Sequence, residues 1–131
     1  MTNLGVSALF WLMVNAYHEA RGETDEGVKA VCHVVMNRAE AQGKSVEAVV
    51  LAPYQFSWAN GGIRPALKDY AAMERCLRLA YEAAKERRDG YRLDGADHYY
   101  APAAMAGGKA PSWAKGMKEV AKIGGHIFFK G

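Results

Sequence analysis

The sequence predicts an α+β fold that is mainly helical, with a small β element. Apolar residues recur with helical spacing over most of the first ninety positions, and glycine or proline separates these segments. The last third instead holds short aromatic runs that are bounded by turn signals. The chain has 131 residues, which fits a single domain spanning residues 1–131.

Two helices are predicted before residue 43. The first runs over about 6–20 and is apolar on most sides, which is typical of a buried helix, and Gly22 ends it. The second runs over about 25–42, where Thr24 or Asp25 can serve as its cap and Gly43 ends it.

Two further helices are expected before residue 89. Ser45 can cap a short helix that ends near Leu51, and an ordered loop rich in aromatic residues follows over 52–65. Pro65 then starts a long helix that reaches about Arg88. Its predicted buried stripe comprises Leu67, Tyr70, Met73, Leu77, Ala80 and Ala84.

The remaining residues predict the small β element. Residues 98–100 are aromatic and extended in character, and turn signals precede them. A small helix is expected over 112–122, and the Gly124-Gly125 turn leads into a final strand at 127–129.

Composition excludes several classes of protein. The net charge of +3 is a mild basic bias, which favours an anionic surface and is too weak to indicate nucleic acid. Cys32 and Cys76 are expected to be reduced core residues. The apolar run 4–14 is too short to span a bilayer and lacks the flanks of a signal peptide, so we expect synthesis in the cytoplasm.

Glu19 is the strongest candidate for chemistry, because it closes an otherwise apolar helix just before Gly22. Burial disfavours the charged form of a carboxyl group and raises its pKa, which a general acid for glycoside cleavage requires. The alternative is a solvated glutamate, although a carboxylate at a helix C-terminus opposes the helix dipole. Position alone leaves both interpretations open.

The other reactive groups give weaker signals. His18-Glu19 begins like a zinc-peptidase motif, but position 22 is glycine where the second histidine is required, and neither a metal nor a cofactor is predicted. No nucleophilic serine motif or phosphate loop occurs. Glu23 is a possible second acid, or it orders the 21–24 turn or caps the second helix.

Aromatic residues form the second signal. Their rings can stack on sugars, and neighbouring polar groups can orient a ligand, although rings can equally pack a core. The candidate substrate-binding residues are Gln55, Phe56, Ser57, Trp58, His98, Tyr99, Tyr100 and Trp113.

Several runs, in the same order, resemble the SleB-like cell-wall hydrolases, a family of spore-cortex-lytic enzymes and related phage proteins. The first is Asn-Ala-Tyr-His-Glu-Ala-Arg-Gly-Glu at 15–23. The others lie at 26–31, 34–38, 54–58, 98–102, 113–114 and 123–129. Together they cover nearly the whole chain, from about Ala8 to Phe129.

This resemblance implies a lysozyme-like fold and cleavage of peptidoglycan between N-acetylmuramic acid and N-acetylglucosamine. It implies a lytic transglycosylase that forms 1,6-anhydro ends, with Glu19 as the acid and base. The alternatives are a muramidase that uses water and, in a different class, a non-catalytic peptidoglycan-binding module. The single-domain form resembles a phage endolysin, for which we expect a monomer that reaches the wall with a holin-type membrane partner.

Overall fold

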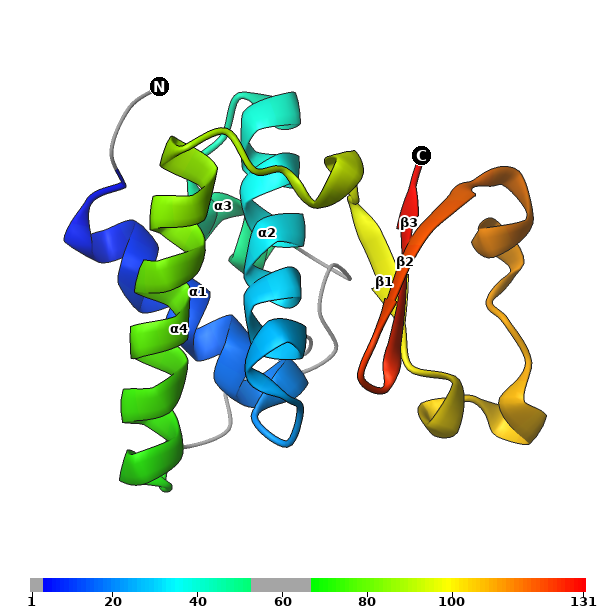
Figure 1. Ribbon diagram of the computed structural model, residues 1–131, viewed down its shortest axis with the longest axis horizontal. Coiled ribbons are helices and arrows are strands. Elements are labelled where there is room, and N and C mark those ends of the chain that lie inside the picture. The colour runs from blue at the N-terminus through cyan, green and yellow to red at the C-terminus, as the bar shows by residue number, and fades with distance from the viewer. Residues whose placement is uncertain (1–3, 53–66) are drawn as a thin grey trace.

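The computed structural model describes residues 4–52 and 67–131. In these residues four α-helices form one lobe, and a three-stranded sheet with a long connecting loop forms a second lobe beside it (Figure 1). The prediction of a mainly helical α+β fold with a small β element is confirmed. None of the helices in these residues is long and apolar enough to cross a membrane.

The first two helices have the predicted bounds. Helix α1 spans Val6–Ala20 and helix α2 spans Asp25–Gln42. Thr24 caps α2 by accepting a hydrogen bond from the backbone of Gly27, and Gly43 ends it in a left-handed conformation. The expectation of a buried α1 holds only for its second half, because the first turns carry exposed side chains such as Phe10, which is 43% exposed.

Helices α3 (Val46–Leu51) and α4 (Tyr70–Arg88) complete the helical lobe. Helix α4 begins later than predicted, since residues 67–69 are not helical. Asp69 caps the helix by accepting from the backbone N–H of Ala72 at 3.0 Å, so the first turn starts after this aspartate.

The predicted buried stripe of α4 is wrong at two of its six positions, Tyr70 and Leu77. Tyr70 is 77% exposed and Leu77 is 45% exposed, whereas Ala80 is buried and Leu67, Met73 and Ala84 are half-buried. The observed buried face comprises Cys76, Leu79, Ala80, Ala83 and Arg87. Cys76, Ala80 and Ala83 are small and let α4 lie close to α1 and α2, whereas Tyr70 and Leu77 point toward solvent.

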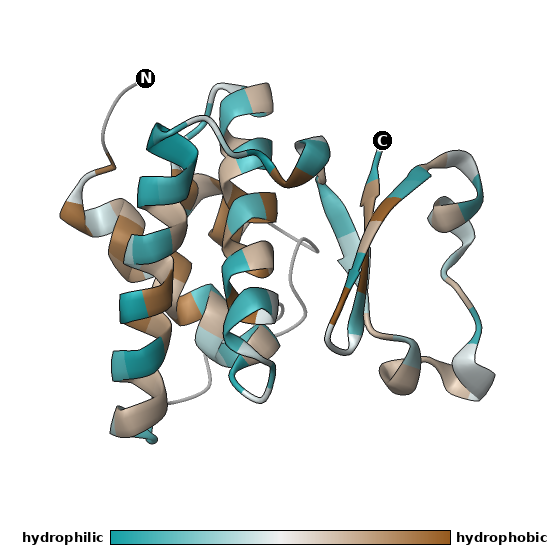
Figure 2. Cartoon of the chain, viewed as in Figure 1, coloured by the Kyte–Doolittle hydropathy of each residue, from teal (hydrophilic) through white to brown (hydrophobic). Residues whose placement is uncertain are grey.

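The core of the helical lobe is built from short aliphatic side chains of α1, α2, α3 and α4. Hydrophobic and hydrophilic residues alternate turn by turn along α2 and α4, as expected for helices with one buried side (Figure 2). Cys32 and Cys76 are both buried and free, which confirms that they are reduced core residues.

A buried polar network connects the helices to the chain that enters the sheet. Asn37 on α2 donates to the carbonyls of Arg92 and Ala96 at 2.9 and 2.7 Å, and its own oxygen accepts from Arg87 at 2.6 Å. The short 3-10 turn η2 (Leu93–Gly95) lies between Arg92 and Ala96. This network fixes the start of the sheet lobe against α2 because buried polar groups need their partners.

The sheet is antiparallel with the order β1-β3-β2, where β1 spans His98–Tyr100, β2 spans Lys118–Ile123 and β3 spans His126–Lys130. The predicted strands at 98–100 and 127–129 are confirmed. The loop from β1 to β2 contains the 3-10 turns η3 (Pro102–Ala104), η4 (Ala106–Gly108) and η5 (Ser112–Gly116).

The predicted helix over 112–122 is wrong, because η5 and β2 occupy it. The run Lys-Glu-Val-Ala-Lys at 118–122 contains good helix formers. Pairing with β3, whose Phe128 is completely buried, overrides this local preference.

Candidate active site

Glu19 lies in the last turn of α1, on the side where the helical lobe meets the sheet lobe. Its side chain is half-buried, and its Oε1 accepts a hydrogen bond from the phenolic O–H of Tyr99 on β1 at 2.5 Å. Segments 80 residues apart in sequence thus meet at one carboxyl group. Of the predicted substrate-binding residues in the described ranges, Tyr99 is the one that contacts Glu19.

The surroundings of Glu19 set its protonation. Burial raises the pKa of the carboxyl group, and the Tyr99 hydrogen bond and the nearby charges of His126 and Arg38 partly offset this effect. Burial and the neighbouring Glu19 hold the pKa of Tyr99 well above its usual value, so the phenol stays protonated and remains a donor. The result is a carboxyl group that keeps its proton to higher pH than an exposed glutamate does.

Two more side chains complete the surroundings of this pair. Arg38 on α2 donates through Nε to the carbonyl of Asp97 at 2.6 Å, which holds its guanidinium near Glu19 and Tyr99. Asn15, one turn before Glu19 on α1, is buried and interacts with the Tyr99 side chain. Both lie in runs that carry the family resemblance. Helical spacing places Asn15 on the same face of α1 as Glu19, whereas only the packing of α2 brings Arg38 to this site.

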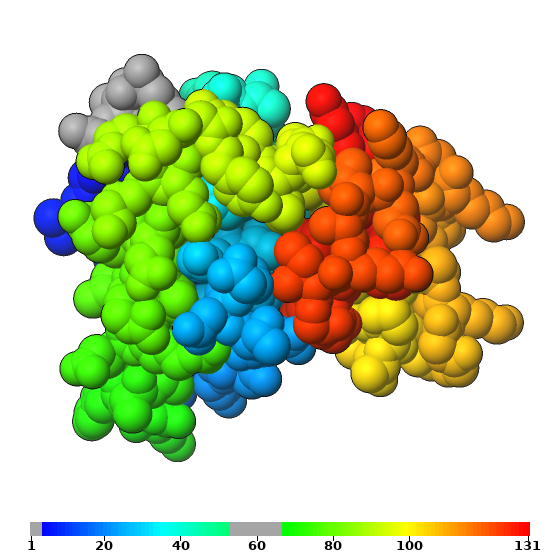
Figure 3. Space-filling model, in the orientation of Figure 1, coloured from blue at the N-terminus to red at the C-terminus, as the bar shows by residue number. Residues whose placement is uncertain are grey.

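Glu23 lies in the loop between α1 and α2 and is directed at the turn between β2 and β3. Its Oε1 accepts from the backbone N–H of Gly125 at 2.7 Å and lies 3.8 Å from Nδ1 of His126. The space-filling view shows the β2–β3 end of the sheet directly against this region of the helical lobe (Figure 3). Glu23 therefore orders a turn, but that turn is far away in sequence, and Thr24 is the residue that caps α2.

The sheet separates the other predicted aromatic residues from Glu19. Side chains alternate across a strand, so His98 and Tyr100 project from the face opposite to Tyr99. There they pack with Trp113 of η5 and Phe129 of β3, with ring centroids 5.1 to 6.0 Å apart. His98, Tyr100 and Trp113 are half-buried and form an aromatic cluster with Phe129 on the face opposite to Tyr99, and their role in substrate binding stays a prediction.

Two other predictions concern residues 55–58 and metal binding. Gln55, Phe56, Ser57 and Trp58 lie outside the described residues. Within residues 4–52 and 67–131, no group of three or more His, Cys, Asp or Glu side chains is arranged to hold a metal ion.

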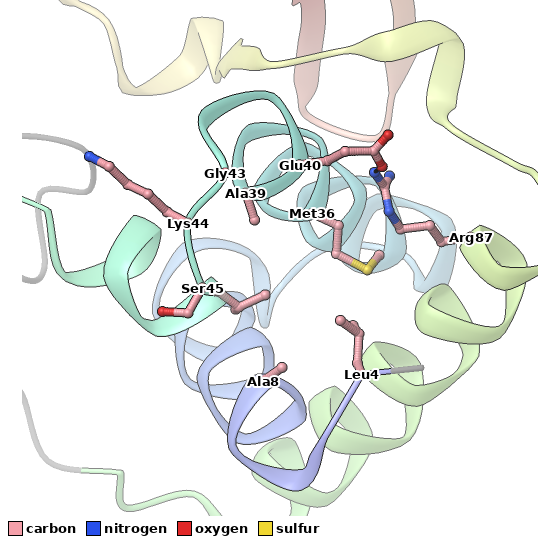
Figure 4. Close-up of a pocket in the computed structure, with 10 residues that line it drawn as sticks. Leu4, Ala8, Met36, Ala39, Glu40, Gly43, Lys44, Ser45 and Arg87 are labelled. Atoms are coloured by element: carbon pink, nitrogen blue, oxygen red, sulfur yellow. Dashed lines mark hydrogen bonds and ion pairs between the residues drawn. The ribbon is translucent and has the colours of Figure 1, made fainter. Parts of the chain in front are cut away.

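A separate apolar pocket of about 400 Å³ lies at the far end of the helical lobe (Figure 4). It is lined by Leu4, which precedes α1, by Ala8 of α1, and by Met36 and Ala39 of α2, with Lys44 and Ser45 at its edge. Glu19 is at the opposite end of α1, about 20 Å away at the usual rise per residue. The pocket is therefore distinct from the candidate active site.

Comparison with known proteins places this arrangement in context. The chain is similar to the catalytic domain of the Bacillus cereus SleB protein, with 25% identity and a TM-score of 0.67 over 99% of this chain and 98% of that one. It also shares the fold of the catalytic domain of the germination-specific lytic transglycosylase SleB from Bacillus anthracis, with 24% identity and a TM-score of 0.69 over 99% and 100% of the two chains. No curated protein sequence matches it.

The family model described as cell wall hydrolase matches residues 22–129, which include Glu23, Tyr99 and His126. Glu19 lies three residues before the matched range and within the structural similarity, which covers nearly the whole chain. The chain therefore belongs to the cell wall hydrolase family.

Proposed function

We propose that the protein cleaves the glycan strands of peptidoglycan between N-acetylmuramic acid and N-acetylglucosamine, as a lytic transglycosylase with Glu19 as its catalytic acid and base. The observation that carries the proposal is the half-buried Glu19 carboxyl group, which has a raised pKa and a Tyr99 hydroxyl group at 2.5 Å. Family membership supports the substrate class, and one structural relative is named a lytic transglycosylase.

The reaction would start with proton transfer from Glu19. Tyr99 donates to Oε1, so the transferable proton of the acid form belongs on Oε2. This proton passes to the glycosidic oxygen as the bond to the muramic anomeric carbon breaks, which leaves an oxocarbenium-like centre. The new Glu19 carboxylate is stabilised by the Tyr99 hydrogen bond and by the nearby positive charge of Arg38.

The second half of the reaction would return a proton to Glu19. The carboxylate takes the proton of the C6 hydroxyl group on the muramic residue, and the C6 oxygen bonds to the anomeric carbon. The product is a 1,6-anhydro end, no water is consumed, and Glu19 regains its acid form. A second carboxylate is not required, which agrees with the commitment of Glu23 to the Gly125 backbone.

Product analysis tests this proposal. The purified protein is incubated with purified peptidoglycan, and the masses of the soluble muropeptides are measured. We expect anhydro ends, which are one water lighter than reducing ends. Reducing ends would instead identify a water-using muramidase, and binding without any released glycan would identify a peptidoglycan-binding module.

Delivery to the wall and the remaining substrate contacts stay predictions from the sequence resemblance. We propose that Gln55, Phe56, Ser57 and Trp58 contact the glycan, and that the protein is a monomeric phage endolysin with a holin-type partner. Expression in bacterial cells, with and without a membrane-permeabilising protein, tests the endolysin role. We expect lysis only when both are present, and lysis by the chain alone would contradict it.

A further inference from the structure

We propose that Glu23 is a positioning residue that joins the two lobes: it holds the β2–β3 turn against the catalytic helix and, through His126 and Tyr99, keeps Glu19 in place. This inference rests on the proposed function, because it assigns a role relative to Glu19. It concerns a second acidic residue of the same site, for which a direct catalytic role is the competing interpretation.

The packing around Glu23 shows a carboxylate that fits closely between glycines. A Cβ atom added at Gly124 would overlap with Glu23 Oε1, and one added at Gly125 would lie 3.0 Å from Oε2. One added at Gly27 of α2 would lie 3.1 Å from the Glu23 Cβ. Three glycines from two elements thus leave room for one side chain, and Gly124 also has a φ of 56°, which side chains other than glycine rarely adopt.

The backbone of Glu23 is fixed from a third direction by Arg75 of α4. Its guanidinium donates to the carbonyls of Glu23 and Arg21 at 2.8 and 3.2 Å and to Oδ1 of Asp25 at 2.7 Å. An arginine that makes several hydrogen bonds at once restrains a loop more strongly than a single bond does. The Glu23 side chain therefore extends from a restrained support toward the sheet lobe.

The turn that Glu23 holds leads directly to the Tyr99–Glu19 pair. His126 follows Gly125, is only 6% exposed, and packs its ring edge-on against Tyr99 with centroids 5.2 Å apart. Tyr99 in turn donates to Glu19. A shift of the turn would move His126 and loosen the Tyr99 side chain, so the position of Glu23 is transmitted to the catalytic carboxyl group by direct packing.

The direction of the Glu23 carboxylate argues against a role as second acid. Its Oε1 faces a backbone N–H of its own chain, and the side chain is 23% exposed. A catalytic carboxylate must instead direct an oxygen at the sugar or at a water beside it. Glutamine can accept the same Gly125 hydrogen bond without a charge, which separates the two roles experimentally.

The experiment compares Glu23→Gln, Glu23→Ala and the matched control Glu26→Ala, an exposed acid in the first turn of α2, in the full chain on purified peptidoglycan. We expect Glu23→Gln and the control to lose no more than about threefold in kcat. For Glu23→Ala we expect about a tenfold loss in kcat with little change in KM, as for the loss of one hydrogen bond that orients the site.

A pH profile and a double variant distinguish positioning from general stability. Burial raises the pKa of Glu19, and three neighbours lower it in part: the Tyr99 hydrogen bond and the charges of His126 and Arg38. In Glu23→Ala, the loosened Tyr99 should therefore move the alkaline limb of kcat to higher pH. Because both changes act through one contact, Glu23→Ala combined with Tyr99→Phe should be barely less active than Tyr99→Phe alone.

Three outcomes would overturn the inference. A folded Glu23→Gln protein as inactive as Glu19→Gln would make Glu23 a second catalytic acid. Losses that add fully in the double variant, or an unmoved pH profile in Glu23→Ala, would reduce Glu23 to a structural residue. An active Glu19→Gln protein would instead remove the proposed function itself, which is a separate result that no Glu23 variant can produce.

Discussion

The helical lobe and the sheet lobe contribute different parts of the candidate site. The helical lobe has an aliphatic core and supplies Glu19 from a helix that packs against α4, α2 and α3. The sheet lobe supplies Tyr99 from its inner face and packs a separate set of rings on its outer face. The comparison teaches that the candidate acid Glu19 comes from one lobe and its hydrogen-bond donor Tyr99 comes from the other, so the site forms only where the two lobes meet.

Among the variants that compare regions of the molecule, the largest expected effect separates the two faces of β1. Tyr99→Phe removes the hydrogen bond to Glu19, and a bond to a charged group is worth about 1.5–3 kcal/mol, so kcat should fall roughly 10- to 100-fold. Because this bond lowers the pKa of Glu19, its loss should also shift the alkaline limb of the pH profile upward. Kinetic assays over a pH series measure both effects.

Tyr100→Phe is the matched control for this variant, since Tyr100 lies on the same strand and the opposite face. It should change kcat by less than about threefold, as is usual for a substitution away from the reacting groups. Equal losses in both variants would show that the two faces do not differ in function.

The next effect should fall on stability rather than on activity. Trp113→Ala removes a ring that packs on Tyr100 and Phe129, and for a half-buried tryptophan the free energy of unfolding should drop by about 2 kcal/mol. Urea unfolding measures this loss, and turnover well below the transition should stay within about threefold. A stable variant that no longer binds peptidoglycan would instead establish Trp113 as a substrate contact.

A smaller effect tests the junction between the lobes. Gly124→Ala imposes both a strained φ and a clash with Glu23, whereas Gly107→Ala imposes only the strained φ, because a Cβ atom there would meet nothing within 4 Å. We expect a loss of about 1 kcal/mol for Gly107→Ala and about twice that for Gly124→Ala. Similar thermal unfolding of the two variants would contradict a close fit of Glu23 between its glycines.

The smallest expected effect is a gain in stability when the carboxyl group of Glu19, the proposed catalytic acid, is removed. Burial raises the pKa of Glu19 in the folded protein above its ordinary value of 4.5, so the stability from its protonated form is present below pH 4.5 and is lost as pH rises through the folded pKa. At pH 8, Glu19→Gln should therefore have a higher free energy of unfolding than the native protein, by on the order of 1 kcal/mol or less. Urea unfolding measures this difference. If the difference in unfolding free energy between Glu19→Gln and the native protein were the same at pH 4 and pH 8, a raised pKa of Glu19 would be contradicted.

The helical lobe could be predicted from sequence because its information is local. Apolar periodicity and caps such as Thr24 and Ser45 place α1, α2 and α3 at their observed bounds. The sheet lobe could be predicted only in part, because the 118–123 segment has helix-forming residues and becomes a strand by pairing with β3. The local sequence of this segment does not indicate that pairing.

The candidate site shows the same division. The place of Glu19 at the end of an apolar helix makes it a candidate, and the resemblance singles it out as the acid, but its contact with Tyr99 joins residues 80 positions apart. The alternation along β1 decides which of its three aromatic residues faces the acid, and this depends on which face of the sheet packs on the helices. The resemblance identified His98, Tyr99 and Tyr100 as one motif, and the fold places Tyr99 on one face of β1 and His98 and Tyr100 on the other.

The most direct test of the account is the activity of Glu19→Gln on purified peptidoglycan, measured as soluble muropeptide released by a protein whose fold is verified by circular dichroism. Loss of a general acid that also serves as base should reduce the release about 100- to 10,000-fold, while peptidoglycan binding persists. A folded Glu19→Gln protein that releases glycan at the native rate would contradict the central claim.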